Sequence, residues 1–372
     1  MRTMEWGRTG QWRLTVNWRV ALLAVVLLTL CDALMAQETS LTVVELNVEN
    51  LFDTAHDSLK NDREWLPGAD RHWSRRKYWD KLNRIGQAIL SCGVLRVPLA
   101  RQSEVRAPLA CQSKNDNGNG NVDEDQGWVL PDLVGLCEVE NDSCLFDLCR
   151  RSLLRRAEYE YVMTDSPDSR GIDVALLYSP FAFRLLNHRS VQVTPLPDMR
   201  PTRDILYAAG ELMTGDTLHV FVLHAPSRIG GERLTEPHRL QAMRFLCAVI
   251  DSVRCESPLA RLLVMGDFND NGDGEAFQLL LSHGLMDVSL QAAGSHGARG
   301  TYKYKGRWDR LDHILVSENW VPHIADCRIH DAPFLLEDDG KYGGVQPFRT
   351  YVGYRYRGGF SDHLPLVLTI RP

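Results

Sequence analysis

The chain has 372 residues, of which 44% are hydrophobic and 24% charged, and its formal net charge is −6. A chain of this size and composition can bury a large core, which excludes an intrinsically disordered protein and a polytopic membrane protein. The negative charge gives no general attraction to nucleic acid, although a local basic patch would still be compatible with such binding. Neither an internal repeat nor a change of composition divides residues 37–372, so we expect one domain there.

The first 36 residues are predicted to be a targeting segment. Four arginines precede an apolar run from Val20 to Leu30, and Ala33 to Ala36 offers small residues for cleavage. This order is typical of a secretory signal peptide; a retained anchor is the alternative, but the run is short for a bilayer. We therefore expect residues 37–372 to be exported, periplasmic or extracellular, with no stable membrane insertion. The leader carries four arginines and two acids, so the mature net charge would be −6 − 2 = −8.

Nine cysteines are present, and removal of the leader with Cys31 leaves eight. An exported protein can form disulfides, and Cys92 with Cys111 or Cys144 with Cys149 are conceivable pairs that the sequence does not fix. No CxxC motif occurs, which argues against a zinc site.

In chain order, residues 41–48 alternate and predict a first strand, and residues 78–90 show helical spacing. Residues 97–127 lack periodicity and are predicted to be a flexible insertion. Within it, residues 115–126 imitate a calcium loop, but Gln126 stands where a bidentate glutamate is needed, so Ca²⁺ is the alternative interpretation. Further strands are predicted at 132–138, 172–178, 218–223, 262–265, 311–316 and 364–370, and helices at 141–154 and 234–253.

Polar side chains stand where these apolar strands begin or end. They are Asn47, Glu138, Arg170, His224, Asp267 with Asn269, Asp312, and Asp362 with His363. Alone, each has an ordinary interpretation: Gly266-Asp267 as a turn, His224 as a core or surface histidine. If they converge, carboxylates can hold Mg²⁺ or Mn²⁺, a histidine can move a proton, and amide and guanidinium groups can stabilise an oxyanion. That inventory indicates metal-assisted hydrolysis of a phosphate ester.

The same segments carry a resemblance to a known family. LNVENLFD (46–53), GLCEVEN (135–141), SRGIDVALLY (169–178), LHAPSRIGG (223–231), MGDFND (265–270), GTYKYKGRWDRLDHILVS (300–317) and GGFSDHLPL (358–366) resemble the endonuclease/exonuclease/phosphatase superfamily. The motifs occur in the family's order over residues 41–370. The resemblance implies the α/β DNase I-like fold, a four-layer sandwich of two packed mixed sheets flanked by helices.

The resemblance also implies roles for the site residues. The metal, Mg²⁺ or Mn²⁺, would be held chiefly by Glu138, assisted by Asn47 and Asp362. Catalytic roles fall to six further residues: Asp267 on the attacking water, Asn269, His224 and Arg170 at the phosphate, and His363 as general acid/base or phosphate-stabilising imidazole with Asp312 behind it. Leu223 stands where the family often has asparagine or threonine, and this difference leaves the implied roles unchanged.

These observations predict an exported, divalent-metal-dependent phosphodiesterase, most simply a monomeric endonuclease acting on nucleic acid. The residues expected to contact the nucleic-acid backbone are Arg228, Lys303, Lys305 and Arg307. Trp308 could stack on a base, although a position in the core suits it better. The alternative is a phosphatase or phosphodiesterase acting on lipid head groups, inositol phosphates or nucleotides. A non-catalytic binding protein on the same scaffold is a third hypothesis, opposed by the intact set of Glu138, Asp267 and His363.

Overall fold

The structure, a computed structural model, describes residues 3–6, 12–15, 40–95 and 128–371. These form two compact units, residues 1–40 with 371–372, and Leu41–Ile370. In the smaller unit, β1 (Thr3–Trp6) pairs antiparallel with β2 (Trp12–Thr15). Most of the predicted signal peptide lies outside the described residues, as do the predicted insertion with its calcium-like loop, and Cys111.

Two six-stranded mixed sheets form the larger unit. The first has the order β17 (Ile324–Ile329), β22 (Leu366–Ile370), β3 (Leu41–Leu51), β6 (Leu133–Val139), β8 (Asp173–Tyr178) and β7 (Glu160–Met163). The second has the order β13 (Leu285–Asp287), β16 (Asp312–Ser317), β12 (Arg261–Asp267), β11 (Thr217–His224), β10 (Ile205–Leu212) and β9 (Phe183–Val191).

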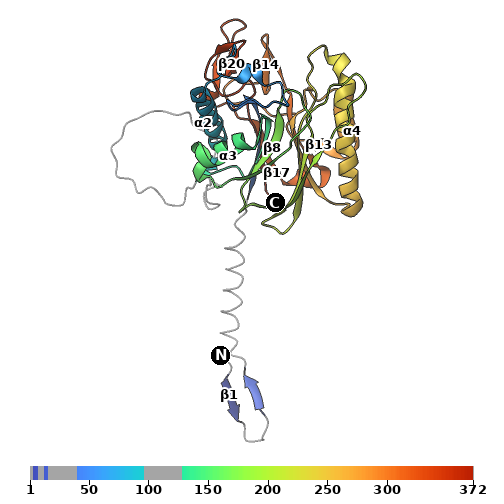
Figure 1. Ribbon diagram of the computed structural model, residues 1–372. Helices are drawn as coiled ribbons and strands as arrows, with labels where there is room; N and C mark the ends of the chain where they lie inside the picture. Colours follow the sequence, from blue (N-terminus) through green and yellow to red (C-terminus); the bar gives the residue numbers. More distant parts are fainter. Residues whose placement is uncertain (1–2, 7–11, 16–39, 96–127, 372) are drawn as a thin grey trace, which may run out of the picture. The chain divides into compact units, whose positions relative to one another are not determined.

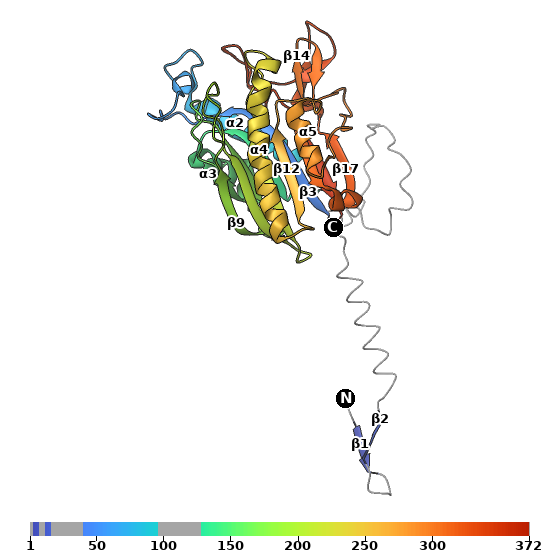
Figure 2. The same ribbon diagram turned by 90° about the vertical axis from the view of Figure 1, so that its right-hand side faces the viewer.

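Helices cover the outer faces of both sheets. They are α2 (Arg75–Ser91), α3 (Asp142–Arg151), α4 (Glu232–Glu256) and α5 (Glu275–Ser282), with 3-10 helices at Arg63–Trp65, Leu153–Arg156, Glu318–His323 and Pro333–Leu335. Helices α2 and α3 lie outside the first sheet, and α4 lies outside the second (Figure 1); the turned view shows α5 beside α4 (Figure 2). The predicted four-layer DNase I-like sandwich is confirmed.

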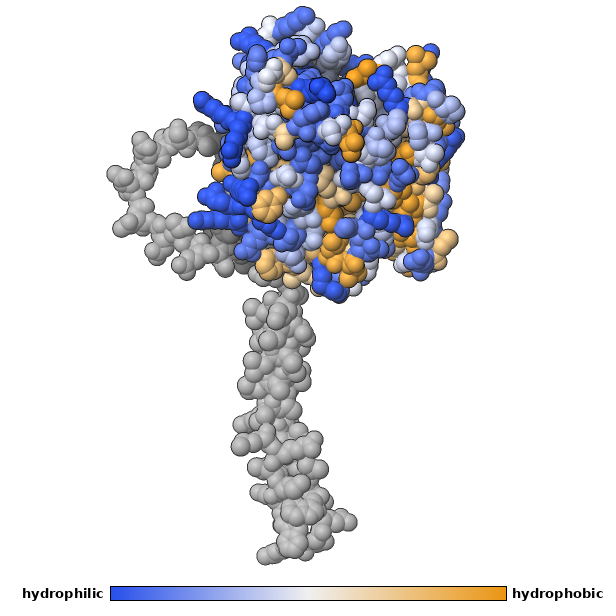
Figure 3. All heavy atoms as spheres, viewed as in Figure 1, coloured by the Kyte–Doolittle hydropathy of each residue, from blue (hydrophilic) through white to orange (hydrophobic). Residues whose placement is uncertain are grey.

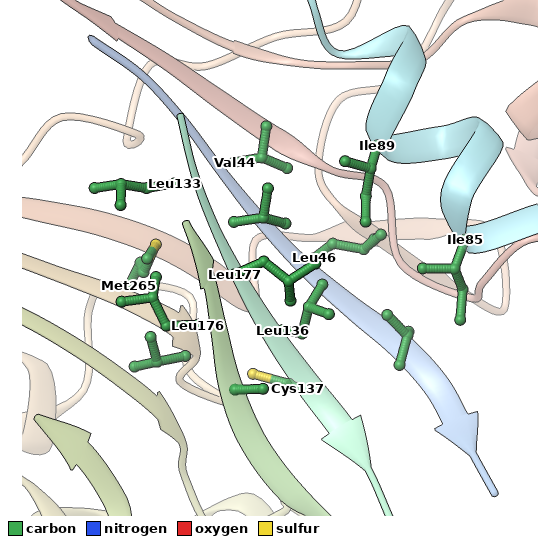
Figure 4. Close-up of a cluster of buried hydrophobic side chains, with 14 of the residues drawn as sticks. Val44, Leu46, Ile85, Ile89, Leu133, Leu136, Cys137, Leu176, Leu177 and Met265 are labelled. Carbon is green, nitrogen blue, oxygen red and sulfur yellow. The ribbon is translucent and has the colours of Figure 1, made fainter. Parts of the chain in front are cut away.

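Helix α2 shows how the layers are joined. Its N-cap Ser74 accepts a hydrogen bond from the amide of Lys77, and apolar residues at helical spacing follow. Ile85 and Ile89 point from α2 towards Val44 and Leu46 of β3 (Figure 4). Met265 of β12 lies on the opposite side of the first sheet, so the central strands are buried on both faces (Figure 4).

Short hairpins complete the fold. They are β4 (Val94–Leu95) with β5 (Trp128–Val129), β14 (Tyr302–Tyr304) with β15 (Arg307–Asp309), β18 (Leu336–Asp338) with β19 (Val345–Pro347), and β20 (Tyr351–Val352) with β21 (Arg355–Tyr356). No helix in the described part of the chain is long and apolar enough to cross a membrane.

Every strand predicted from the sequence is present, with ends shifted by a few residues. The predicted helix 141–154 is α3 followed by a separate 3-10 turn. All seven cysteines within the described ranges are free thiols, so a Cys144–Cys149 bridge is not formed. These two cysteines are five residues apart on α3 and therefore point to different sides of the helix.

Candidate active site

Three of the predicted site residues form one row across the second sheet. Asp267, the last residue of β12, is in register with His224 on parallel β11 and with Asp312 on antiparallel β16. Each is buried, and the three strands are otherwise largely apolar near the row, with His313 beside Asp312 as an exception. The row therefore follows from three apolar runs that reach polar residues at the same level of the sheet.

Gly266 makes this close arrangement possible. Its φ is +146°, and a Cβ atom added there would lie 1.8 Å from the carbonyl oxygen of Leu223 on β11. No side chain fits that gap. Glu138 and Asn269, both at the site, also have positive φ values, 68° and 50°. Such backbone conformations cost energy in non-glycine residues and concentrate at functional sites.

The first sheet supplies the other half of the site. Asn47 is near the end of β3 and Glu138 near the end of neighbouring β6. Arg170 precedes β8, whose antiparallel pairing with β6 brings its start to the same edge. Asp362 and His363 precede β22, which pairs with β3. The Nδ2 atom of Asn47 donates to Oδ2 of Asp267 at 3.1 Å, which joins the two halves.

His363 is a buried imidazole surrounded by carboxylates. Its Nδ1 lies 2.7 Å from Oδ2 of Asp312, and its Nε2 lies 3.9 Å from both Asp267 Oδ2 and Asp362 Oδ1. Burial alone would lower the pKa of His363, but the charge and hydrogen bond of Asp312, helped by Asp362 and Asp267, raise it well above its ordinary value. His363 is therefore suited to be an imidazolium at neutral pH.

His224 has the opposite character. Burial, followed by the charges of Arg203, Arg170 and His363, lowers its pKa well below the ordinary value. Its Nε2 lies 3.5 Å from Oδ2 of Asp267, and its buried Nδ1 has no hydrogen-bond partner among the described residues. A neutral imidazole in this position can give or take one hydrogen bond with a bound group.

Asp267 is the carboxylate at the centre. Burial and the neighbouring charge of Asp312 raise its pKa to about 7, against the lowering effects of His363 and of hydrogen bonds from Asn269 and Asn47. Its Oδ1 accepts from the amide of Asn269 at 2.9 Å, while the side chain of Asn269 donates to Ala225 O at 3.1 Å. A carboxyl group with a pKa near neutrality can accept a proton from water under physiological conditions.

Glu138 and Arg170 form a second cluster with Asn50. One carboxylate oxygen of Glu138 accepts from the amide of Asn50 at 2.9 Å, and the other lies 3.4 Å from Nη2 of Arg170. The same Nη2 donates to Asn50 Oδ1 at 2.8 Å. The side chain of Arg170 is 44% exposed, so the guanidinium reaches solvent beside the buried centre.

The donor set fits a hard divalent cation. Oxygens of Glu138 and Asp362 are of the type that Mg²⁺ and Mn²⁺ prefer. Asn47 Oδ1 already accepts from the amide of Glu49 at 3.0 Å and keeps one lone pair. Oδ1 of the buried Asp312 has no hydrogen-bond partner in residues 40–95 and 128–371. Ligand atoms of Asp267, Asp312 and His363 also lie within 4.8 Å of one another, although the Asp312–His363 hydrogen bond already uses one atom of each.

Two buried charged residues beside the site were not predicted from the sequence. Glu45 is fully buried, and within the part of the chain that the structure describes neither carboxylate oxygen has a hydrogen-bond partner. Burial, then Asp312 and Asp267, raise its pKa well above the ordinary value, which favours the neutral acid. Strand alternation is the signal that could have found it, since Glu45 is two residues before Asn47 and shares its face of β3.

The second unpredicted residue is Lys81 of α2. Its Nζ donates to Thr350 Oγ1 at 2.5 Å and to Phe360 O at 2.7 Å, and the charges of Glu49, Asp362 and Glu138 act on it. Burial lowers its pKa to about 8. Its spacing of three residues from Tyr78 places it on the buried face of the helix, and this spacing was the available signal.

Most of the side chains predicted to contact a nucleic-acid backbone form ion pairs within the protein. Arg228 and Arg307 both pair with Asp309, at 3.0 and 3.1 Å, and buried Lys303 pairs with Asp339 at 2.8 Å. Lys305 has its Nζ 5.1 Å from the ring centroid of Tyr304. Trp308 is partly buried against the core, as its second interpretation predicted.

The sequence profile of the endonuclease/exonuclease/phosphatase family matches residues 42–97 and 121–372. The chain belongs to this family. Comparison with curated proteins gave no match. As a member of the family, the chain has the fold of phosphoester hydrolases.

Solved structures with this fold include three from Bacteroides. An endonuclease/exonuclease/phosphatase family protein of B. thetaiotaomicron is 16% identical with a TM-score of 0.54, covering 89% of this chain and 95% of that one. A mannosyl-6-phosphatase of the same organism is 17% identical with a TM-score of 0.53, covering 89% and 99%. An endonuclease/exonuclease/phosphatase of B. vulgatus is 15% identical with a TM-score of 0.52, covering 89% and 98%. At these identities the likeness concerns the fold.

Proposed function

We propose that this chain is a divalent-metal-dependent hydrolase of compact phosphate esters. The observation that carries the proposal is the buried group of Asp267, His224 and His363, in which a carboxyl with a pKa of about 7 lies between two imidazoles of opposite pKa shift. Groups whose surroundings push their pKa values apart can divide acid and base work between them.

Each residue then has a defined task. Asp267 accepts a proton from water as the water oxygen bonds to phosphorus. His224, neutral, and Asn269 hold phosphoryl oxygens, and the imidazolium of His363 stabilises their growing charge or protonates the oxygen released when the phosphorus–oxygen ester bond breaks. Arg170 meets the substrate from the solvent side.

Glu138, Asp362 and Asn47 would hold the metal. A bound divalent ion neutralises negative charge on the phosphoryl group and orients the substrate. Arg170 would exchange its long 3.4 Å contact with Glu138 for a phosphate oxygen, because guanidinium groups bind phosphate well.

A compact substrate is favoured over a long polyanion by the pairing of the cations around the site. Arg228 and Lys303 are largely buried and pair with Asp309 and Asp339 within 3.0 Å, so they offer little free charge to a nucleic-acid backbone, whereas Arg307 shares Asp309 and is 71% exposed. The fold neighbour named as a mannosyl-6-phosphatase is consistent with small substrates. Nucleic-acid phosphodiesters are the second candidate, favoured by the exposed guanidinium of Arg170.

The test is hydrolysis by purified residues 37–372 with Mg²⁺, with Mn²⁺ and with EDTA. Substrates are p-nitrophenyl phosphate, bis-p-nitrophenyl phosphate, a panel of sugar and nucleoside phosphates, supercoiled plasmid and single-stranded RNA. We expect turnover of small esters that EDTA abolishes and Mg²⁺ restores, and none by Glu138→Ala, Asp267→Ala or His363→Ala. Cleavage of plasmid or RNA alone would establish the nuclease candidate, and EDTA-resistant turnover would contradict the metal.

We also propose that the protein is exported, on the sequence pattern of residues 1–36. Separately, we propose that it is a monomer. Amino-terminal sequencing of the cell-envelope and secreted fractions tests the export, and we expect a new terminus at Gln37. Size-exclusion chromatography with light scattering tests the monomer. An uncleaved protein in the cytosol would contradict the export.

A further inference from the structure

A polar recess lies among the hairpins that precede the final motif. Its volume is about 420 Å³, within the range of small-ligand sites, and it is bordered by the β14–β15 turn, the loop between β18 and β19, and the β20–β21 hairpin. Labels β14 and β20 mark this end of the unit in Figure 1. The corresponding surface in Figure 3 is largely hydrophilic.

Arg349 connects the recess to the catalytic centre. It lines the recess, and its Nη1 lies 3.9 Å from Oδ2 of Asp362. Its guanidinium also lies over the ring of Tyr302, 5.2 Å from the centroid, and that ring is 4.9 Å from the imidazole of His363. Arg349 and Tyr302 therefore lie between the recess and His363.

Two tyrosines, each with a lysine beside it, line the recess. Tyr304 and Tyr342 are 55% and 48% exposed, so part of each ring is open to solvent. The Nζ of Lys305 is 5.1 Å from the Tyr304 centroid, and the Nζ of Lys341 is 5.0 Å from the Tyr342 centroid. Neither ammonium has a carboxylate within ion-pair distance in the described part of the chain, in contrast to Lys303 and Arg357.

Gly306 shapes the wall between the two tyrosines. Its φ is +82°, and an added Cβ would lie 2.8 Å from Cβ of Tyr342. The β14–β15 turn therefore rests directly against Tyr342. This contact places both tyrosine–lysine pairs on one recess.

We propose that this tyrosine–lysine recess binds the non-reacting part of the substrate, a ring that carries a second anionic group. The rings of Tyr304 and Tyr342 offer faces for stacking, and Lys305 and Lys341 offer ammonium groups that form no ion pair among the described residues. The recess is also lined by Glu337, Asp338 and Asp339, of which Glu337 is paired with Arg357 and Asp339 with Lys303. A nucleoside bisphosphate and a sugar bisphosphate share this chemistry. The inference rests on the proposed phosphoester hydrolysis.

The first experiment compares kcat/KM for two matched pairs of substrates with Mg²⁺. They are adenosine 3′,5′-bisphosphate against adenosine 5′-monophosphate, and glucose 1,6-bisphosphate against glucose 6-phosphate. We expect a preference of about tenfold or more for the bisphosphate in at least one pair, and the preferred pair identifies the ring. Lys305→Gln with Lys341→Gln should reduce that ratio to near one, while Arg244→Gln on exposed α4 is the charge control.

The second experiment measures binding without turnover. Calorimetric titration of the intact protein in EDTA with the same compounds should show tighter binding of the bisphosphate, weakened by Gly306→Ala and by Tyr342→Leu. One outcome is hydrolysis without a preference for the bisphosphate, together with unchanged binding by the lysine variants. It would overturn the binding role of the recess but leave the proposed hydrolase function intact. Preferential binding of the bisphosphate without any hydrolysis would overturn the proposed hydrolase function but leave the binding role of the recess intact.

Discussion

His363 and Asp312 belong to different sheets, yet Nδ1 of the first lies 2.7 Å from Oδ2 of the second. His363 stands before β22 of the first sheet, and Asp312 begins β16 of the second. The hydrogen bond fixes the imidazole so that Nε2 faces Asp267 and Asp362. Packing of the sheets therefore decides the protonation of His363.

Asp312→Asn tests this coupling. Loss of the carboxylate charge removes the main influence that raises the pKa of His363, so the imidazolium should deprotonate at lower pH. We expect kcat to fall by about 10²–10⁴ at pH 8, and the high-pH fall of the rate profile to move towards lower pH. Kinetic pH profiles and NMR titration of His363 measure both, and Asp326→Asn on exposed β17 is the control. An unchanged profile would contradict the role of Asp312.

The pKa values of Asp267 and Glu49, both raised to about 7 chiefly by burial, predict how stability depends on pH. In the folded state these carboxyls bind protons between pH 4 and 7 that the unfolded chain has released. Their stabilising contribution is therefore complete below pH 4 and lost as pH rises through 7. In EDTA, we expect the free energy of unfolding to decrease from pH 5.5 to 8, and Glu49→Gln to flatten the slope. Denaturant titrations across this range measure it, and an increase would contradict the prediction.

Lys81 and Glu49 together hold the segment that leads to Ser361, Asp362 and His363. Glu49 accepts from the amides of Thr350 and Tyr351 at 2.6 and 3.3 Å, and Lys81 binds Thr350 and Phe360. Lys81→Met removes the hydrogen bonds to Thr350 and Phe360 and the positive charge near Glu49, and should cost about 1–3 kcal/mol of stability. The double variant Lys81→Met/Glu49→Gln should recover part of that loss. Additive effects in the double-mutant cycle would show that the two are not coupled.

Gly266→Ala should prevent the site from forming. The added methyl group would overlap the Leu223 carbonyl at 1.8 Å and the backbone would be strained, so we expect a loss of more than about 3 kcal/mol, or no folded protein. Gly68→Ala is the matched control because nothing lies within 4 Å of the added atom. Circular dichroism melting curves compare the two variants, and equal melting temperatures would contradict the argument.

Sequence alone could predict the central strands because each is a continuous apolar run that ends in a polar residue, as at Met265–Asp267. It could not predict β9, whose residues are largely exposed and show no clear alternation. The pairing of Asn47 with Asp267 was also out of reach, since 220 residues separate them. The pairing of Lys303 with Asp339 could not be predicted either, because no local pattern connects two residues that are 339 − 303 = 36 positions apart.

The pairing of β22 with β3 has a consequence for the order of events when the protein is made. β3 leaves the ribosome early, but its neighbour β22 and the imidazole of His363 emerge more than 300 residues later. Until then Asn47 and Glu138 exist without the proton-carrying group opposite them. Because Asp362 and His363 are made together, the nascent chain also lacks one of the proposed metal ligands, and the proposed hydrolysis should appear abruptly when the last strand joins the sheet.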